Sequence, residues 1–141
     1  MRTVPKPKRQ KRISDRTLDK LVRRYLLLKY NNQCQRCKRY FGDEMLEVAH
    51  LNRRGKKTVK WDLRNVALLC INNPKTNEVG CHHIIDNHIM EMTSFMLEIL
   101  TGEEIEAVDR LANMTLKEYP IDRAEIKRDL KEKIKRLDGS N

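Results

Sequence analysis

The sequence predicts an α+β fold in which a small strand-containing core is stapled by a metal ion and flanked by helices. Three observations lead to this prediction. Apolar residues recur at helical spacing towards both ends of the chain, two short apolar segments with strand character lie in the middle, and four cysteines bracket those segments in pairs. Because only 39% of the 141 residues are hydrophobic, the core is thin, and a structural metal would add folding energy.

A basic arm and a helix open the chain. Residues 1–13 contain lysines, arginines and two prolines but no acidic residue. This composition predicts a disordered arm, which either lies along a phosphate backbone or is only a solvated tail. After Ser14 or Asp15 as N-cap, apolar residues recur at helical spacing, which predicts an N-terminal helix within residues 14–32.

Two short strands are expected between the cysteines. Apolar residues alternate over residues 46–51, and a second apolar run covers residues 66–69. Residues 52–60 carry five lysines and arginines around Gly55 and are too basic to be buried, so we expect an exposed loop there. Residues 71–80 are rich in asparagine and contain a proline, which predicts a second loop.

One long helix is predicted to follow the last cysteine. An apolar stripe at helical spacing runs from His82 to Leu100 and includes Ile89 among its inward positions. Thr101 and Gly102 come next, and a glycine just after an apolar stripe is typical of a helix C-cap. We therefore expect a single helix that ends at this glycine.

Two more helices are predicted in the remainder of the chain, over residues 103–113 and 122–137. Asp122 and Glu125 make a capping box for the second of them, and Gly139 stops it. The chain is thereby divided into a basic arm, an N-terminal helix, a central core and a C-terminal helical extension, over residues 1–13, 14–32, 33–101 and 102–141.

The four cysteines are predicted to bind one structural zinc ion. Cys34 and Cys37 form a C-x2-C pair, and Cys70 and Cys81 flank the second loop. Four thiolates leave no open position for water, so such a zinc would be structural. The alternatives are four independent thiols, two disulfides, or a site in which one of the two histidines after Cys81 replaces a cysteine.

Positive charge is concentrated in the first half of the chain. Residues 1–65 carry a net charge of +14 and residues 66–141 a net charge of −4, against +10 for the whole. This asymmetry favours DNA or another polyanion as partner, because each neutralised phosphate releases counterions; simple solubility is the alternative. Neither a signal sequence nor an apolar stretch long enough for a bilayer is present, so we expect no membrane contact and a cytoplasmic location.

Three polar residues form an ordered motif around the cysteines: His50 ends the first predicted strand, Asn65 precedes the second, and His82 follows the last cysteine. Here the chain resembles the HNH endonucleases, whose ββα-metal fold is often held by zinc knuckles. The resemblance covers about residues 33–88 and rests on Cys34-Gln35-Arg36-Cys37, Val48-Ala49-His50-Leu51, Arg53-Arg54-Gly55-Lys56-Lys57, Asn65-Val66, Leu69-Cys70 and Cys81-His82.

The resemblance implies a role for each of these residues. His50 would deprotonate the attacking water, Asn65 would brace the loop and orient His50, and His82 would bind a catalytic divalent metal such as Mg²⁺ or Mn²⁺. The family places an aspartate or histidine ligand just before the base, where this chain has Ala49. Ligands in its place are sought on the predicted helix, which gives the candidate metal set His82, His83, Asp86 and His88.

The implied function is metal-dependent cleavage of DNA. Phosphodiester hydrolysis, by nicking or by double-strand cleavage, would leave 5′-phosphate and 3′-hydroxyl ends with little sequence preference. The family's compact members suggest a role in phage DNA processing or packaging, or in defence. Contacts to the DNA backbone are expected from the basic loop, through Arg53, Arg54, Lys56, Lys57 and Lys60.

Two other functions are compatible with the same residues. A non-catalytic zinc-ribbon module, derived from an HNH domain that lost a metal ligand at Ala49, would bind DNA without cutting it. A protein-interaction scaffold would bind DNA without salt dependence or not at all. The C-terminal helices either buttress the core or bind a protein partner.

Overall fold

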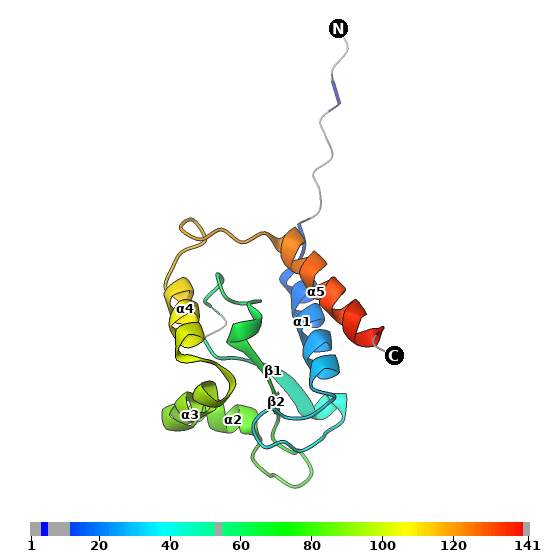
Figure 1. Cartoon of the computed structure of the whole chain (residues 1–141). Helices are drawn as coiled ribbons and strands as arrows, with labels where there is room; N and C mark the ends of the chain where they lie inside the picture. Colours follow the sequence, from blue (N-terminus) through cyan, green and yellow to red (C-terminus); the bar gives the residue numbers. More distant parts are fainter. Residues whose placement is uncertain (1–3, 6–11, 53–54, 140–141) are drawn as a thin grey trace.

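The computed structural model describes residues 4–5, 12–52 and 55–139 and shows a mixed fold of helices and strands, as predicted (Figure 1). Most of the predicted arm, together with Arg53 and Arg54, lies outside the described residues. The elements are α1 (Asp15–Lys29), β1 (Leu46–His50), β2 (Val66–Cys70), α2 (Cys81–Asn87), α3 (Ile89–Ile99), α4 (Gly102–Ala112) and α5 (Arg123–Asp138), with 3₁₀ turns at Asp43–Met45 and Leu63–Asn65.

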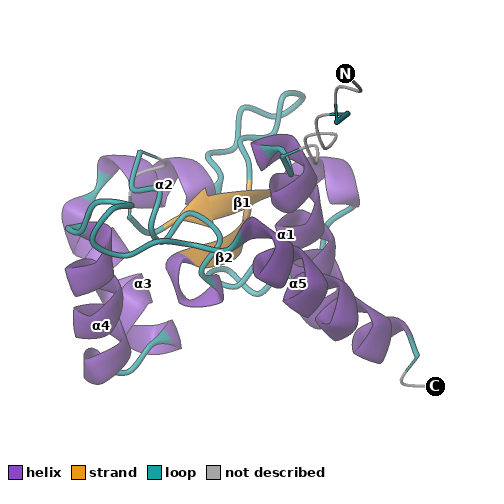
Figure 2. Cartoon of the chain, turned by 90° about the horizontal axis from the view of Figure 1, so that it is seen from above, coloured by secondary structure: helices purple, strands orange, loops and turns teal. Residues whose placement is uncertain are grey.

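The two strands form a small antiparallel sheet at the centre of the molecule. The register places Leu46 opposite Cys70 and His50 opposite Val66. Every residue of β2 is buried, whereas β1 has exposed and buried positions. Seen from above, the sheet lies between α1 and α5 on one side and α2 and α3 on the other (Figure 2). Helix α1 contacts both strands, and α2 contacts β2.

Helix α1 begins and ends as its sequence predicts. The Ser14 hydroxyl accepts a hydrogen bond from the Thr17 backbone N–H, which satisfies one of the free donors at the helix start. Asn31 and Asn32 both have positive φ, a conformation that asparagine tolerates and that ends the helix. Its core face is apolar and buried, through Leu18, Val22, Tyr25 and Leu26. Burial of each such side chain stabilises the fold by roughly 1.5–3 kcal/mol.

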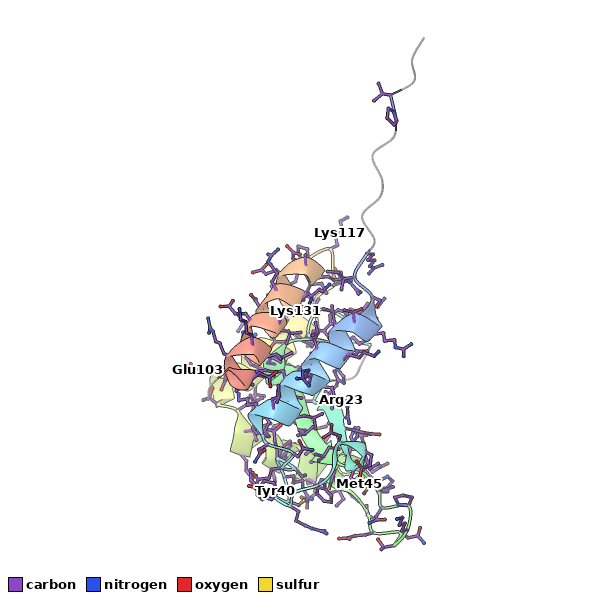
Figure 3. The ribbon with its side chains drawn as sticks, turned by 90° about the vertical axis from the view of Figure 1, so that its right-hand side faces the viewer. Arg23, Tyr40, Met45, Glu103, Lys117 and Lys131 are labelled. Carbon is purple, nitrogen blue, oxygen red and sulfur yellow. The ribbon has the colours of Figure 1, made fainter. Side chains whose placement is uncertain are left out.

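The last helix packs against the first, and both run in the same direction. Arg123 at the start of α5 forms a 2.6 Å ion pair with Asp15, and Asp138 at its end lies 3.0 Å from Arg24. In the side view of Figure 3, α1 and α5 lie next to one another. The apolar side chains between them belong to the same core as the sheet. The C-terminal extension thus buttresses the core through α5.

The helix predicted from His82 to Leu100 is in fact two helices. His88 has an extended backbone, with φ −134° and ψ 101°, so α2 ends before it and α3 begins after it. The sequence hides the break because neither proline nor glycine marks it and apolar residues continue across it. As a result Ile89, which the stripe predicts to face inward, is 80% exposed, while Phe95 is buried in the core.

The predicted glycine C-cap is also wrong, because Thr101 and Gly102 begin α4. The Thr101 hydroxyl accepts from the Glu104 backbone N–H, and the Glu104 carboxylate accepts from the Thr101 backbone N–H. This reciprocal capping box stabilises a helix start. A threonine followed three residues later by glutamate was the stronger signal, and Gly102 does not have the positive φ that a glycine C-cap needs. In the described ranges, no helix combines the length and apolar character needed to cross a membrane.

Candidate functional site

The four cysteines come together into one cluster, so the spacing prediction is met despite the unusual second pair. Their sulfur atoms all lie within 4.8 Å of one another, and the Cys37 and Cys70 Sγ atoms are 3.9 Å apart. A tetrahedral zinc with Zn–S bonds of about 2.3 Å separates its sulfurs by about 3.8 Å. All four residues are free thiols and no histidine joins the set, which disfavours the disulfide and mixed-ligand alternatives. The cluster can hold a structural metal ion such as zinc.

Backbone N–H groups point at the sulfur atoms of this cluster. The Cys70 N–H donates to Cys34 Sγ at 3.4 Å, and the Cys81 N–H donates to Cys70 Sγ at 3.3 Å. Burial opposes ionisation of Cys34, but backbone hydrogen bonds from Cys37 and Cys70 outweigh it and lower the pKa of that thiol. Burial raises the pKa of the Cys37 and Cys70 thiols. The surroundings therefore favour ionisation of Cys34 and oppose it at Cys37 and Cys70, where the charge of a bound cation would be needed to hold thiolates.

The ten residues between Cys70 and Cys81 fold back on themselves, so the long insertion does not separate the ligands. Asn73 closes the loop, with its backbone N–H donating to the Glu78 carbonyl at 2.9 Å. Gly80 then returns the chain to the end of β2. A Cβ at Gly80 would collide with the Ile71 carbonyl group and come within 2.6 Å of the Cys70 carbonyl oxygen. Only glycine allows this approach, which brings Cys81 beside Cys70.

Asn65 holds the two ends of the basic loop together. It is fully buried, at 0% exposure, immediately before β2. Its Oδ1 accepts from the Asn52 backbone N–H at 2.8 Å and from the Asn52 side chain at 2.9 Å, and its Nδ2 donates to the Val59 carbonyl at 3.0 Å. One side chain therefore closes the loop between residues 52 and 59.

His50 ends β1 and is held by the far end of the same loop. Its Nε2 lies 3.1 Å from the Lys60 carbonyl oxygen. A carbonyl only accepts, so Nε2 carries the hydrogen of this bond, and in the neutral ring Nδ1 is the basic atom. Because Asn65 fixes Val59, the residue before Lys60, the orientation of His50 depends on the closed loop.

The Lys60 side chain turns inward instead of towards solvent. Its ammonium group lies 3.1 Å from Asp15 and 3.9 Å from Asp19, and 5.1 Å from the centre of the Trp61 ring. The side chain is only 15% exposed. Arg123 covers the same ring at 4.7 Å. Lys60 therefore anchors the loop to α1. A lysine that contacts DNA was expected to point into solvent instead.

His82, in the first turn of α2, lies between two carboxylates. Its Nδ1 is 2.8 Å from Glu47 Oε2 on β1, and its Nε2 is 3.3 Å from Asp86 Oδ2 one helical turn later. The i, i+4 relation to Asp86 matches the predicted shared helix face. In the part of the chain that the structure describes, the four cysteines are the only set of three or more ligand-type residues close enough to hold one metal.

An open pocket of about 790 Å³ joins the two histidines. His50 lines it from the sheet, and His82 and Asp86 line it from α2. A smaller pocket of about 250 Å³, between β1 and α1, also has His50 in its wall. His50 thus lines both pockets.

Other predicted site residues lie elsewhere. His83 is exposed, and the larger pocket is not lined by it. His88 is exposed at the break between α2 and α3 and is not a lining residue, although Asn87 and Ile89 on either side of it are. Lys56 and Lys57 are exposed in the loop, as a contact with the phosphate backbone of DNA requires. The structure therefore brings together His50, His82 and Asp86 but not the full candidate metal set.

Sequence reasoning missed Glu47. It is the only carboxylate in either strand, in the segment LEVAH, and its side chain is 53% exposed. The available signal was a charged residue in a short strand. Apart from His50, the rest of that strand is apolar. The contact itself could not be predicted, because it depends on how α2 crosses the sheet.

Comparisons with models of protein families, with curated proteins and with solved structures gave no match. The chemistry of the side chains is therefore what indicates a function. The cysteine cluster suits a structural cation, and the pocket offers a basic imidazole at His50 with a nitrogen and a carboxylate oxygen at His82 and Asp86. Exposed lysines at the rim of the loop add positive charge.

Proposed function

We propose that this protein is a metal-dependent DNA endonuclease of the HNH type, with a structural zinc on its four cysteines. The observation that carries the proposal is that His50 and His82 line one pocket while the loop that holds His50 is closed by Asn65. These are the three residues, in the order His, Asn, His, on which the family resemblance rests. A base, an orienting loop and a cation ligand are the parts that phosphodiester hydrolysis needs.

His50 acts as the general base in this proposal. The contact of its Nε2 with the Lys60 carbonyl orients the ring, and the imidazole would take up the proton from water. Imidazole is the side chain that most often takes part in proton transfer as a general base. The carbonyl contact keeps the ring from turning, so the basic atom stays fixed relative to the pocket.

His82 and Asp86 are the residues that would hold the divalent cation. The Asp86 carboxylate is the kind of oxygen donor that Mg²⁺ and Mn²⁺ prefer, and His82 adds one nitrogen. These ions commonly keep several waters and take only one or two protein carboxylates together with substrate phosphates. When bound, the cation would polarise the scissile phosphate and stabilise the leaving 3′ oxygen. Two protein donors on one helix turn compensate for Ala49, which offers no ligand.

DNA contacts come from the basic loop. Lys56 and Lys57 are exposed there and can neutralise phosphates beside His50. Arg53 and Arg54 belong to the same loop by sequence. Contacts of this kind read the backbone and not the bases, so cleavage is expected to have little sequence preference.

A supercoiled-plasmid nicking assay with Mg²⁺ or Mn²⁺ tests the proposal. Wild type is compared with His50→Ala after both are shown to have equal zinc content and equal melting temperature. We expect wild type to nick and the variant to lose at least about 100-fold in rate, the lower range for general-base catalysis. Added imidazole should restore part of the rate to the variant, because it supplies the missing base.

A second candidate function is favoured by Ala49 and by the lack of a second three-residue ligand cluster in the described ranges. It is a non-catalytic zinc module that binds DNA. If wild type and His50→Ala bind DNA equally and neither nicks with any divalent cation, this second function replaces the first.

A further inference from the structure

We propose that Glu47 is a positioning residue that fixes His82 as a metal ligand through its Nε2 atom. The inference rests on the proposed function, because it assumes that a divalent cation binds at His82. It goes beyond that function by assigning a role to a strand carboxylate that belongs to neither the base nor the candidate ligand set. The observation that carries it is the 2.8 Å contact between Glu47 Oε2 and His82 Nδ1.

The contact determines which nitrogen of His82 can bind a metal. A neutral imidazole carries one hydrogen, and a carboxylate accepts hydrogen bonds but does not donate them. At 2.8 Å the hydrogen therefore lies on Nδ1 and points to Glu47. Nε2 is left with the lone pair, and a metal binds only a nitrogen that has one.

The other side of the ring is consistent with a cation there. Nε2 lies 3.3 Å from Asp86 Oδ2, so with the hydrogen on Nδ1 two acceptors face each other. Either a second hydrogen on Nε2, which makes the ring an imidazolium that donates to both carboxylates, or a divalent cation between Nε2 and Asp86 removes this repulsion. In the proposed site the divalent ion takes the place of that hydrogen between Nε2 and Asp86. Glu47, at the opposite nitrogen, lies too far round the ring to be a ligand of the same ion.

The fold holds the two partners on separate elements. Glu47 is on β1, opposite Leu69 of β2, while His82 follows Cys81, whose backbone N–H donates to Cys70 Sγ. The start of α2 is thus tied to the cysteine cluster at the end of the sheet. The Glu47 carboxylate is 53% exposed and so keeps part of its hydration, which makes a folding role for this residue minor. Carboxylates that orient a metal-bound histidine raise its basicity and fix its tautomer.

The tautomer of His82 is the first measurement. Long-range ¹H–¹⁵N correlation spectra of zinc-loaded protein, without Mg²⁺ or Mn²⁺, distinguish a ring with hydrogen on Nδ1 from one with hydrogen on Nε2. At alkaline pH, where the ring is neutral, wild type and Glu47→Gln should show the Nδ1–H form, since the amide oxygen still accepts. Glu47→Ala should lose this preference. Glu98→Gln, at an exposed glutamate of α3, is the control and should match wild type.

Mn²⁺ affinity is the second measurement, followed by the electron paramagnetic resonance of free Mn²⁺. Glu47→Ala should bind about 10- to 100-fold more weakly than wild type, with Glu47→Gln in between and Glu98→Gln unchanged. Equal zinc content and melting temperature of all four proteins show that the fold is intact. An Nε2–H tautomer in wild type, or Mn²⁺ binding by Glu47→Ala as tight as by wild type, overturns the inference.

Failure of the inference and failure of the proposed function give different results. If wild type binds Mn²⁺ and responds to Glu47→Ala but nicks no DNA, the role of Glu47 stands and the endonuclease proposal falls. If wild type nicks DNA and Glu47→Ala keeps both tautomer and affinity, the endonuclease proposal stands and the role of Glu47 falls. If wild type binds no Mn²⁺ at all, both fall.

Discussion

The side-chain Nδ2 of Asn65 donates to the carbonyl oxygen of Val59 at 3.0 Å, one residue before the carbonyl that holds His50. Replacement by alanine would leave the partly buried Asn52 backbone N–H without its acceptor and remove one of the two donors to the Val59 carbonyl, which also accepts from the Asp62 N–H. We expect Asn65→Ala to lower the free energy of unfolding by about 2–4 kcal/mol, because unsatisfied buried polar groups are costly. Urea unfolding measures this.

The control for that prediction is Asn113→Ala. Asn113 is exposed at the end of α4, and its side chain bonds only its own helix, at the Asp109 carbonyl. The expected decrease in the free energy of unfolding is below about 1 kcal/mol. Equal losses for the two variants would show that Asn65 does not brace the loop.

The lysines of the basic loop, residues 52–60, should differ in their effect on DNA binding. Lys56→Gln with Lys57→Gln should reduce the slope of log affinity against log salt by about 0.9 for each phosphate that these lysines no longer neutralise. Lys60→Gln should leave the slope unchanged and instead destabilise the fold, because Lys60 binds Asp15 and Asp19. Fluorescence anisotropy on a short duplex at several salt concentrations separates the two effects. A change of slope for Lys60→Gln alone would contradict the assignment.

Asp15 should make stability depend on pH in the acid range. Its hydrogen bonds with Arg123 and then Lys60 lower the pKa of the carboxyl in the folded state. A lowered folded pKa gives stability that is fully present above the unfolded value of about 3.9 and is lost as pH falls through the folded value. Wild type should therefore exceed Asp15→Asn in unfolding free energy at pH 6, by at most about 1 kcal/mol for so exposed a pair.

The measurement is urea unfolding of both proteins between pH 6 and pH 3. The difference between them should shrink on the acid side only. A difference that grows on acidification would show that the carboxylate is not stabilised by these two cations.

Gly80→Ala should weaken both the fold and the metal cluster. The added Cβ would meet the Ile71 carbonyl group and the Cys70 carbonyl oxygen, so the backbone must move where Cys81 begins. We expect the free energy of unfolding to fall by about 1–3 kcal/mol and the zinc content to be lower. Gly102→Ala is the matched control, because a Cβ there meets nothing within 4 Å. Thermal unfolding and metal analysis of both variants check the prediction, and equal behaviour would refute it.

Removal of the metal should unfold much of the core. A strong chelator should take about one zinc per chain and abolish the cooperative melting transition, since structural zinc sites contribute roughly 10–16 kcal/mol of apparent binding free energy. Cys37→Ser should weaken zinc binding and lower the melting temperature. A chelated protein that melts as the zinc form does would mean that the cluster is only a group of packed thiols.

The sequence was informative where local signals and apolar periodicity agree. Helix α1 has a serine cap, an apolar stripe and two asparagines at its end, and both strands have the expected bounds to within one residue. The cysteine spacing predicted a cluster whose closure then depended on Gly80. These features follow from neighbours in the chain or from chemistry that has few alternatives.

Features that depend on how helices and strands pack against one another could not be predicted from the sequence. The break at His88 has no proline or glycine to mark it, and it is a single extended residue between two apolar segments. Lys60 looks like any basic loop residue until α1 brings Asp15 and Asp19 beside it. Glu47 meets His82 only because α2 starts at the metal cluster. Each of these features joins residues far apart in the chain or depends on the path of a whole helix.

The parallel packing of α5 on α1 has a consequence for how the protein folds. Arg24 and Asp138 are 114 residues apart in the chain, and the first helix is synthesised long before its main helical partner. Until α5 leaves the ribosome, the apolar face of α1 that it covers must stay open to solvent or to chaperones. Contacts of such long sequence separation slow folding. Nascent chains stalled before residue 123 should therefore be far more sensitive to protease in α1 than chains released at full length.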